Sequence, residues 1–169
     1  MGLFTPDVNN LRDLYISTLE HTLSSERQIA EKGLPAMIEK STDPQLAQAF
    51  RNHLTETNEH ISRLERILNA DKGEASDSKC KVTAALISSA ESNISSAAND
   101  SMRDIILIAA GNQVEHHEIA VYGTLRTWAE VLGEHDDAIL LEKTLAEEEN
   151  ADETLSQLSQ KINVAVAAD

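Results

Sequence analysis

The amino-acid sequence predicts an all-α fold, a four-helix bundle with one accessory helix. Only six glycines and three prolines occur in 169 residues, too few for the many turns of a β-sandwich or barrel. Aromatic residues make up 3% of the chain, so Leu, Ile, Val and Ala must form the core, which suits helices packed on helices. Apolar residues also recur at helical spacing in long segments. The length fits a single domain over residues 1–169.

The first helix is expected over about residues 6–40. Thr5-Pro6 begins it well, with Thr5 as the N-cap and proline at the first helical position. Gly33 and Pro35 interrupt the apolar pattern, because proline cannot donate an N–H and clashes with the preceding turn. A kink is therefore expected near residue 32.

The second helix is expected over about residues 44–70, since Asp43-Pro44 repeats the pattern of a cap followed by proline. A serine-rich segment over about 79–98 has only a narrow apolar stripe. This segment is predicted to be an accessory helix in the crossover between the two halves of the bundle.

The third core helix is expected over about residues 101–132, with Asp100 or Ser101 as its cap. Gly133 is a suitable stop, because glycine readily adopts the left-handed conformation that ends many helices. The last helix is expected over about residues 136–162.

The charge and the cysteine content exclude several classes of function. A formal net charge of −15 argues against nucleic acid or an anionic membrane as a partner, because both attract surplus Lys and Arg. The single cysteine, Cys80, permits no internal disulfide, fits a reducing cytosol and is interpreted as a small apolar side chain. With no run of 18 apolar residues and no signal peptide, a cytoplasmic location is expected.

Each core helix carries an acidic residue within its apolar stripe. In the third core helix Glu115 falls on the apolar face, with Glu118 beside it. Burying a lone carboxylate costs several kcal/mol unless a positive charge meets it. The acids on the inner faces of the four helices are Glu26, Glu56, Glu115 and Glu148.

This repetition predicts a site for two metal ions bridged by carboxylates. Two divalent ions bring four positive charges, which four carboxylates neutralise. Bundle proteins with two irons or manganeses take such ligands from facing helices. A ligand set of oxygens with few nitrogens favours iron or manganese over a thiolate zinc site. The predicted metal ligands are Glu26, Glu56, His60, Glu115, Glu118, Glu148 and Asp152.

Other polar residues are interpreted as structural. His53, His116 and His117 are assigned to packing or to the surface, and Glu147 is expected in water. Tyr122 is expected in the core, with its hydroxyl satisfied there or hydrogen-bonded to a ligand carboxylate.

Four motifs resemble the YciE/YciF family of ferritin-like bacterial stress proteins. They are Leu-Ser-Ser-Glu-Arg-Gln around Glu26, His53-Leu-Thr-Glu-Thr, Val114-Glu-His-His-Glu-Ile-Ala-Val-Tyr-Gly-Thr-Leu and Thr144-Leu-Ala-Glu-Glu-Glu-Asn-Ala-Asp. The resemblance covers nearly the whole chain. It implies a rubrerythrin-like bundle with an extra helix, a dinuclear metal site and a homodimer. The predicted acidic ligands match positions where the family carries acids, whereas the family varies at His60.

The leading hypothesis is a stress-response protein that binds two iron or manganese ions and reacts with oxygen or peroxide. Whether it turns over as an oxidase or peroxidase stays open. The alternative is a non-enzymatic interaction protein whose inner acids are paired with arginine or protonated, and a hollow iron-storage cage is a third reading. The candidate partners for the acids are Arg12, Arg27, Arg63 and Arg126.

Overall fold

The structure, a computed structural model, describes residues 8–71 and 79–167. The described residues form helices and no strands, which confirms the all-α prediction. The helices are α1 (Leu11–Gln28), η1 (Ile29–Gly33), α2 (Leu34–Lys40), α3 (Pro44–Asp71), α4 (Lys81–Ser95), α5 (Asp100–Leu132) and α6 (His135–Ala167).

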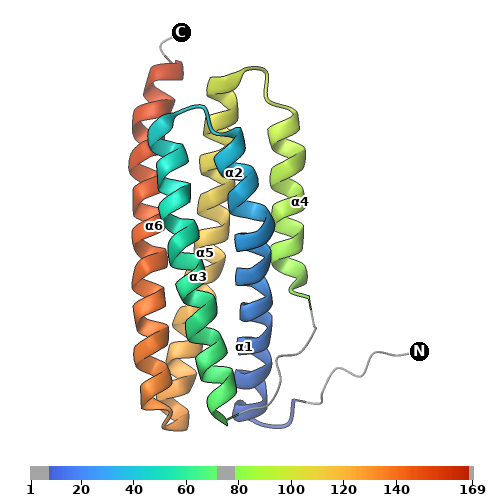
Figure 1. Cartoon of the computed structure of the whole chain (residues 1–169), viewed down its shortest axis with the longest axis vertical. Coiled ribbons are helices and arrows are strands. Elements are labelled where there is room, and N and C mark those ends of the chain that lie inside the picture. The colour runs from blue at the N-terminus through green and yellow to red at the C-terminus, as the bar shows by residue number, and fades with distance from the viewer. Residues whose placement is uncertain (1–7, 72–78, 168–169) are drawn as a thin grey trace, which may run out of the picture.

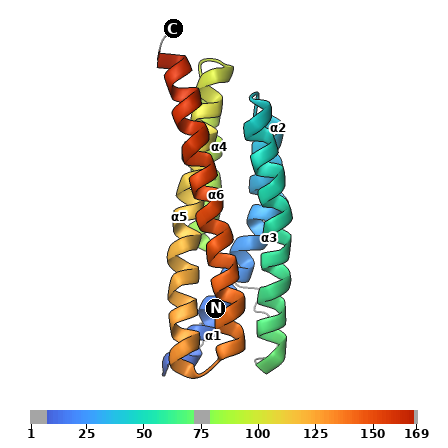
Figure 2. The ribbon, with the colours of Figure 1, turned by 90° about the vertical axis from the view of Figure 1, so that its left-hand side faces the viewer.

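Four long rods form the bundle (Figure 1). The first rod is α1, η1 and α2 in continuation, and the others are α3, α5 and α6. Helix α4 lies outside them, packed against α5, α1 and η1. Figure 2 shows α6 between α5 and α3. The expected accessory helix thus occupies the crossover from α3 to α5.

Helix α1 begins later than the sequence predicted, and helix α5 has a different N-cap from the two that were predicted. Helix α1 begins at Leu11 rather than near residue 6, because the Asn10 side chain accepts a hydrogen bond of 2.9 Å from the Asp13 N–H. The predicted cap Thr5-Pro6 lies outside the described residues. Helix α5 is capped by Asn99, which accepts from the Met102 N–H at 2.9 Å, instead of by Asp100 or Ser101.

The interruption expected near residue 32 is a single turn of π-helix, Ile29–Gly33. The Leu34 N–H donates to the Ile29 carbonyl, five residues back, so the turn holds one residue more than an α-helical turn. Pro35 then lies in the first turn of α2, directly after the π turn.

The turn from α2 to α3 is anchored by a buried carboxylate from another helix. Asp104 of α5, 3% exposed, accepts from the N–H groups of Thr42 and Asp43 at 2.8 Å each. The Asp43 side chain caps α3 as predicted, accepting from the N–H groups of Gln45 and Leu46. Asp104 thereby fixes the end of the first rod against the third.

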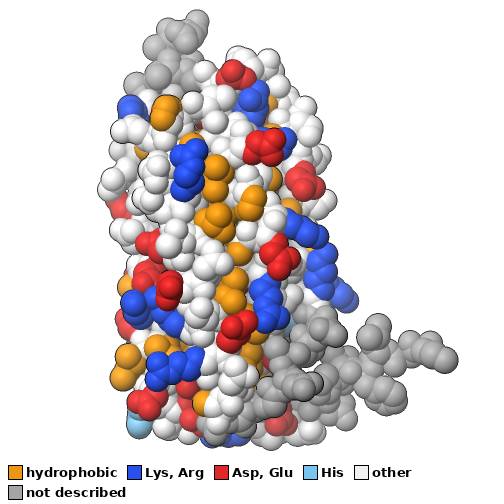
Figure 3. Space-filling model, in the orientation of Figure 1, with side chains coloured by type: hydrophobic (Ala, Val, Ile, Leu, Met, Phe, Trp, Pro, Cys, Tyr) orange, Lys and Arg blue, Asp and Glu red, His pale blue; other side chains and the backbone are white. Residues whose placement is uncertain are grey.

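The apolar core consists of two clusters, one toward each end of the bundle, with charged residues between them. The lower cluster includes Tyr15, Leu19, Leu23, Leu64, Ile67, Tyr122, Leu125 and Leu141. The upper cluster includes Ile29, Leu34, Leu46, Phe50, Leu107, Ile108, Leu155 and Ile162. Along each rod, the buried acids and histidines lie between the residues of the lower cluster and those of the upper cluster. On the surface in Figure 3, apolar side chains follow a narrow line among charged ones.

Candidate metal centre

Six acidic and histidine side chains from all four rods meet in the layer between the two apolar clusters. Each is at most 5% exposed. Helix α1 supplies one, α3 and α5 supply two each, and α6 supplies one. These side chains are Glu26, His53, His60, Glu115, Glu118 and Glu148.

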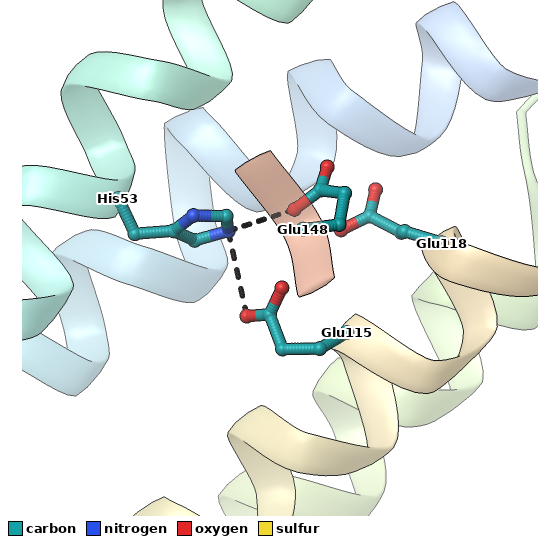
Figure 4. Close-up of side chains that lie close together, drawn as sticks. All are labelled: His53, Glu115, Glu118 and Glu148. Carbon is teal, nitrogen blue, oxygen red and sulfur yellow. Dashed lines mark ion pairs between the residues drawn. The ribbon is translucent and has the colours of Figure 1, made fainter. Parts of the chain in front are cut away.

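A first group of potential ligands consists of His53, Glu115, Glu118 and Glu148 (Figure 4). Nε2 of His53 lies 3.4 Å from Oε1 of Glu115 and 3.6 Å from Oε2 of Glu148. Each of the four residues offers one ligand atom, and these atoms all lie within 4.8 Å of one another. One cation could contact all four.

A second group consists of Glu26, His60 and Glu148. Nδ1 of His60 lies 3.5 Å from Oε1 of Glu26 and 3.0 Å from Oε1 of Glu148. Glu148 therefore belongs to both groups, with one oxygen facing each histidine. A carboxylate in this position can bridge two cations.

The chemistry of these groups fits two divalent ions. Among the described residues, neither oxygen of Glu118 and neither ring nitrogen of His53 has a hydrogen-bond partner. Buried polar atoms are almost always partnered, and leaving one without a partner costs about 1–3 kcal/mol. The four carboxylates of the two groups balance the charge of two divalent cations, and the mixed oxygen and nitrogen donors suit iron or manganese.

Without cations, protons must offset the buried negative charge. Burial raises the pKa of Glu115 and of Glu118 well above the usual value, and neighbouring carboxylates add to the effect. Burial alone would lower the pKa of the histidines, but the charge of Glu115 raises that of His53 to about 9. Hydrogen bonding to Glu148 and Glu26 likewise outweighs burial and raises the pKa of His60 to about 10.

The orientation of His60 is fixed from outside the cluster. Its Nε2 lies 3.0 Å from Oε2 of Glu147, which also forms an ion pair with Arg63. Arg63 further donates to the Thr144 hydroxyl at 3.0 Å. When a cation replaces the proton on Nδ1, the Nε2 proton stays directed to Glu147 and Nδ1 becomes the ligand atom, as is common for histidine ligands of metals.

Tyr122 holds another candidate ligand from within the core. Its ring is fully buried in the lower apolar cluster, and its hydroxyl donates a short hydrogen bond to Oε1 of Glu26. The other oxygen of Glu26 has no hydrogen-bond partner among the described residues. Tyr122 thus occupies one oxygen and leaves the second available to a cation.

The structure brings five of the seven predicted ligands together. Glu56 lies at the edge, with a 37% exposed side chain and Oε2 3.6 Å from Nδ1 of His53. Asp152 lies outside, 3.0 Å from the exposed ring of His116. Neither belongs to the two groups. The five that meet are Glu26, His60, Glu115, Glu118 and Glu148.

Two residues of the cluster and its surroundings are placed otherwise than the sequence interpretation expected. His53 is no packing residue, since both of its ring nitrogens face carboxylates. Glu147 is not free in water, because it is held by Arg63 and His60. The spacing of His53 and His60 carried the missing signal: seven residues are two helical turns, which places both on one face within about 20°.

The arginines do not neutralise the buried acids. Each of the four arginines considered as a partner pairs with an acid outside the two groups. The pairs are Arg12–Glu134, Arg27–Glu65, Arg63–Glu147 and Arg126–Glu142. Among the described residues, the alternative hypothesis therefore finds no arginine paired with the buried acids and would require these acids to be protonated.

Two pockets of different character reach His53 and Glu115. One, of about 100 Å³, opens between α3 and α6 and is lined partly by Asn52, Glu56 and Asn150. The other, of about 40 Å³, lies between the first rod, α4 and α5 and is lined almost wholly by apolar groups. Carbon atoms of α4, including those of Ile87 and Ile94, form its outer wall.

Comparison with known proteins shows the family to which this chain belongs. The family model described as a domain of unknown function, DUF892, matches residues 10–168. The chain belongs to the DUF892 family. A relative of this DUF892 protein, Protein YciF of Escherichia coli strain K12, is 36% identical over 154 residues, covering 90% of this chain and 92% of the relative.

Solved structures agree with this membership. The crystal structure of the E. coli stress protein YciF is 36% identical, with a TM-score of 0.87 over 92% of this chain and 98% of that one. YcfI of Rhodopseudomonas palustris, whose description proposes a structural role, is 35% identical, with a TM-score of 0.86 over 91% and 98% of the two chains. A protein of Xanthomonas campestris pv. campestris, 21% identical with a TM-score of 0.75 over 94% and 97%, shares the fold.

No helix among the described residues of this DUF892 protein has a stretch both long and apolar enough to cross a membrane.

Proposed function

We propose that this DUF892 protein binds two divalent metal ions, iron or manganese, in the layer between its apolar clusters. The observation that carries the proposal is Glu148, a fully buried carboxylate that belongs to both ligand groups and turns one oxygen toward each histidine. The proposed ligands of one ion are His53, Glu115, Glu118 and Glu148, and those of the other are Glu26, His60 and Glu148.

The surrounding residues would prepare these ligands for the ions. Glu147 keeps the His60 proton on Nε2, and Tyr122 fixes the rotamer of Glu26. The apolar clusters on both sides exclude water, so that charges in the layer interact strongly. Two adjacent iron or manganese ions would supply electrons for a reaction with oxygen or peroxide.

Two observations support a reactive stress-response role over mere metal retention. The relative YciF is described as a stress protein. The apolar pocket reaches His53 and Glu115 from the α4 side and suits a small apolar reactant such as dioxygen. We further propose a cytoplasmic homodimer, as the family resemblance implies, with sedimentation velocity as its test.

Metal analysis tests the site directly. Wild-type protein loaded with Mn²⁺ and freed of excess ion is expected to retain two equivalents, and Glu148→Ala none, because both ions lose their shared ligand. Glu149→Ala removes the same charge from the next, exposed position and should retain two. Two equivalents in Glu148→Ala would overturn the proposed ligand set.

Reactivity has its own test. Anaerobic wild-type protein titrated with Fe²⁺ should saturate at two equivalents and develop a near-ultraviolet absorption band after air is admitted. If the protein binds two Fe²⁺ but gives no band, the proposed metal site stands and the proposed reactivity is overturned. A protein that binds no metal would favour the alternative, a bundle that acts by protein contact.

A further inference from the structure

The larger of the two pockets, here called the polar pocket, leads from the surface to buried atoms that have no hydrogen-bond partner among the described residues. It is bounded by α3 on one side and α6 on the other, and its inner end is formed by His53 and Glu115. Both ring nitrogens of His53 and Oε2 of Glu115 lack a hydrogen-bond partner among the described residues, and these side chains are 5% and 3% exposed. The pocket therefore opens onto candidate ligands.

The charges along this pocket attract cations. Its ten lining residues include the carboxylates Glu56 and Glu115 and no Lys or Arg. The apolar pocket, in contrast, has Lys32 and Lys40 as well as Glu91 and Glu115 among its lining residues, so these charges offset one another and its wall offers a cation almost no polar surface. A net charge of −15 adds a long-range attraction toward the whole molecule.

The His53 ring connects the mouth of the polar pocket to its inner end. Nδ1 lies 3.6 Å from Oε2 of Glu56 at the mouth, and Nε2 lies 3.4 Å from Oε1 of Glu115 inside. The 37% exposed side chain of Glu56 can reach a hydrated ion in solvent. The volume of about 100 Å³ holds several water molecules, so an ion can enter with part of its hydration shell.

We propose that divalent cations load through this pocket and that Glu56 is the loading residue, which captures the ion at the mouth and passes it to the ligands beyond His53. This inference rests on the proposed metal site. Glu56 is then a positioning residue for uptake instead of a permanent ligand, which explains why it lies outside both ligand groups.

Stopped-flow binding of Co²⁺ alone, followed by its visible absorption, tests the route. Glu56→Gln should lower the association rate about tenfold through the loss of local attraction. The dissociation rate should fall by the same factor, because ions leave by the same path, and the equilibrium dissociation constant should not change. Glu59→Gln, an exposed acid of α3 outside the pocket, should keep both rates at the wild-type value.

A second pair of variants tests the pocket without removing a carboxylate. Asn52→Arg places a positive charge at the mouth and should slow association, whereas Asn58→Arg, exposed on the same helix outside the pocket, should not. Wild-type rates in both Glu56→Gln and Asn52→Arg would overturn the route while leaving the metal site intact. A weaker equilibrium affinity of Glu56→Gln, with faster dissociation, would make Glu56 a ligand and overturn its loading role. A wild-type protein that binds no Co²⁺ would overturn both proposals.

Discussion

Cys80 shows how much a single residue can depend on its neighbours. It occupies the N-cap of α4 and is buried, with its N–H donating to the Ser24 hydroxyl at 3.0 Å. A hydrogen bond with His117 and another from the Thr83 hydroxyl outweigh burial and lower the pKa of the thiol to about 6. The sequence interpretation of Cys80 as a small apolar residue did not anticipate this polar setting.

The thiol of Cys80 is therefore expected to ionise near pH 6. Thiolate absorbance at 240 nm, measured against pH in metal-free protein, should rise with a midpoint near this value. His117→Ala should move the midpoint toward the ordinary value of 9.0, because the largest favourable contribution is lost. A wild-type midpoint near 9 would contradict the prediction.

At the same scale, the acids were easier to predict from sequence than the histidines. Glu26, Glu115 and Glu148 each break an apolar stripe, and such a break is visible in one helix at a time. His53 is marked in the sequence by its two-turn spacing from His60 alone, and the spacing gains a meaning once the acids of α5 and α6 are known to face α3. Glu56 lies three residues from His53, about 60° around the helix. This rotation places Glu56 at the mouth of the polar pocket and His53 among the candidate ligands.

Among the elements, α5 has one glycine at its C-cap and another within the helix that face opposite requirements. Gly133 ends the helix with φ +79°, a conformation that favours glycine. Gly123 lies within the helix, and a Cβ added there would meet no atom within 4 Å. Only the first of these roles follows from sequence position.

Alanine at these two glycines should change stability in opposite directions. Gly133→Ala should lower the free energy of unfolding by about 1–2 kcal/mol, because a side chain disfavours the left-handed conformation. Gly123→Ala should raise it by about 0.5–1 kcal/mol, through better helix propensity with no clash. Chemical denaturation of both variants provides the measurement, and equal effects would contradict the assigned roles.

The helix ends and the π turn mark the limit of what sequence predicted for the elements. Gly33 and Pro35 indicated an irregularity but not its form, a π turn in which Gly33 faces Ile87 of α4. The start of α1 was predicted from a good capping pattern at Thr5-Pro6, although Asn10 provides the cap through its hydrogen bond with Asp13. Local capping patterns of similar quality thus compete, and the sequence alone did not rank them.

For the whole molecule, the buried protons make the metal-free bundle sensitive to pH. The pKa values of His53 and His60, about 9 and about 10 when folded, exceed the ordinary 6.5. Their stabilising contribution is complete below about pH 6.5 and is lost as the pH rises through the folded values. The raised pKa values of Glu115 and Glu118 act in the same direction from a lower pH.

The melting temperature of metal-free protein should therefore fall between pH 6 and pH 9. Calorimetry in the presence of a chelator measures this change. Protein loaded with Mn²⁺ should show a smaller fall or a rise, because the ions favour the deprotonated ligands. A flat profile without metal would contradict the raised pKa values.

The place of Glu148 in the chain also orders the events of biosynthesis. A growing polypeptide releases α1 and α3 from the ribosome first, with one acid and both histidines of the centre. The carboxylate common to both ligand groups arrives only with α6. A chain stalled or truncated before α6 consequently cannot hold the proposed pair of ions, and metal occupancy would report that α6 has been made and has packed against the other rods.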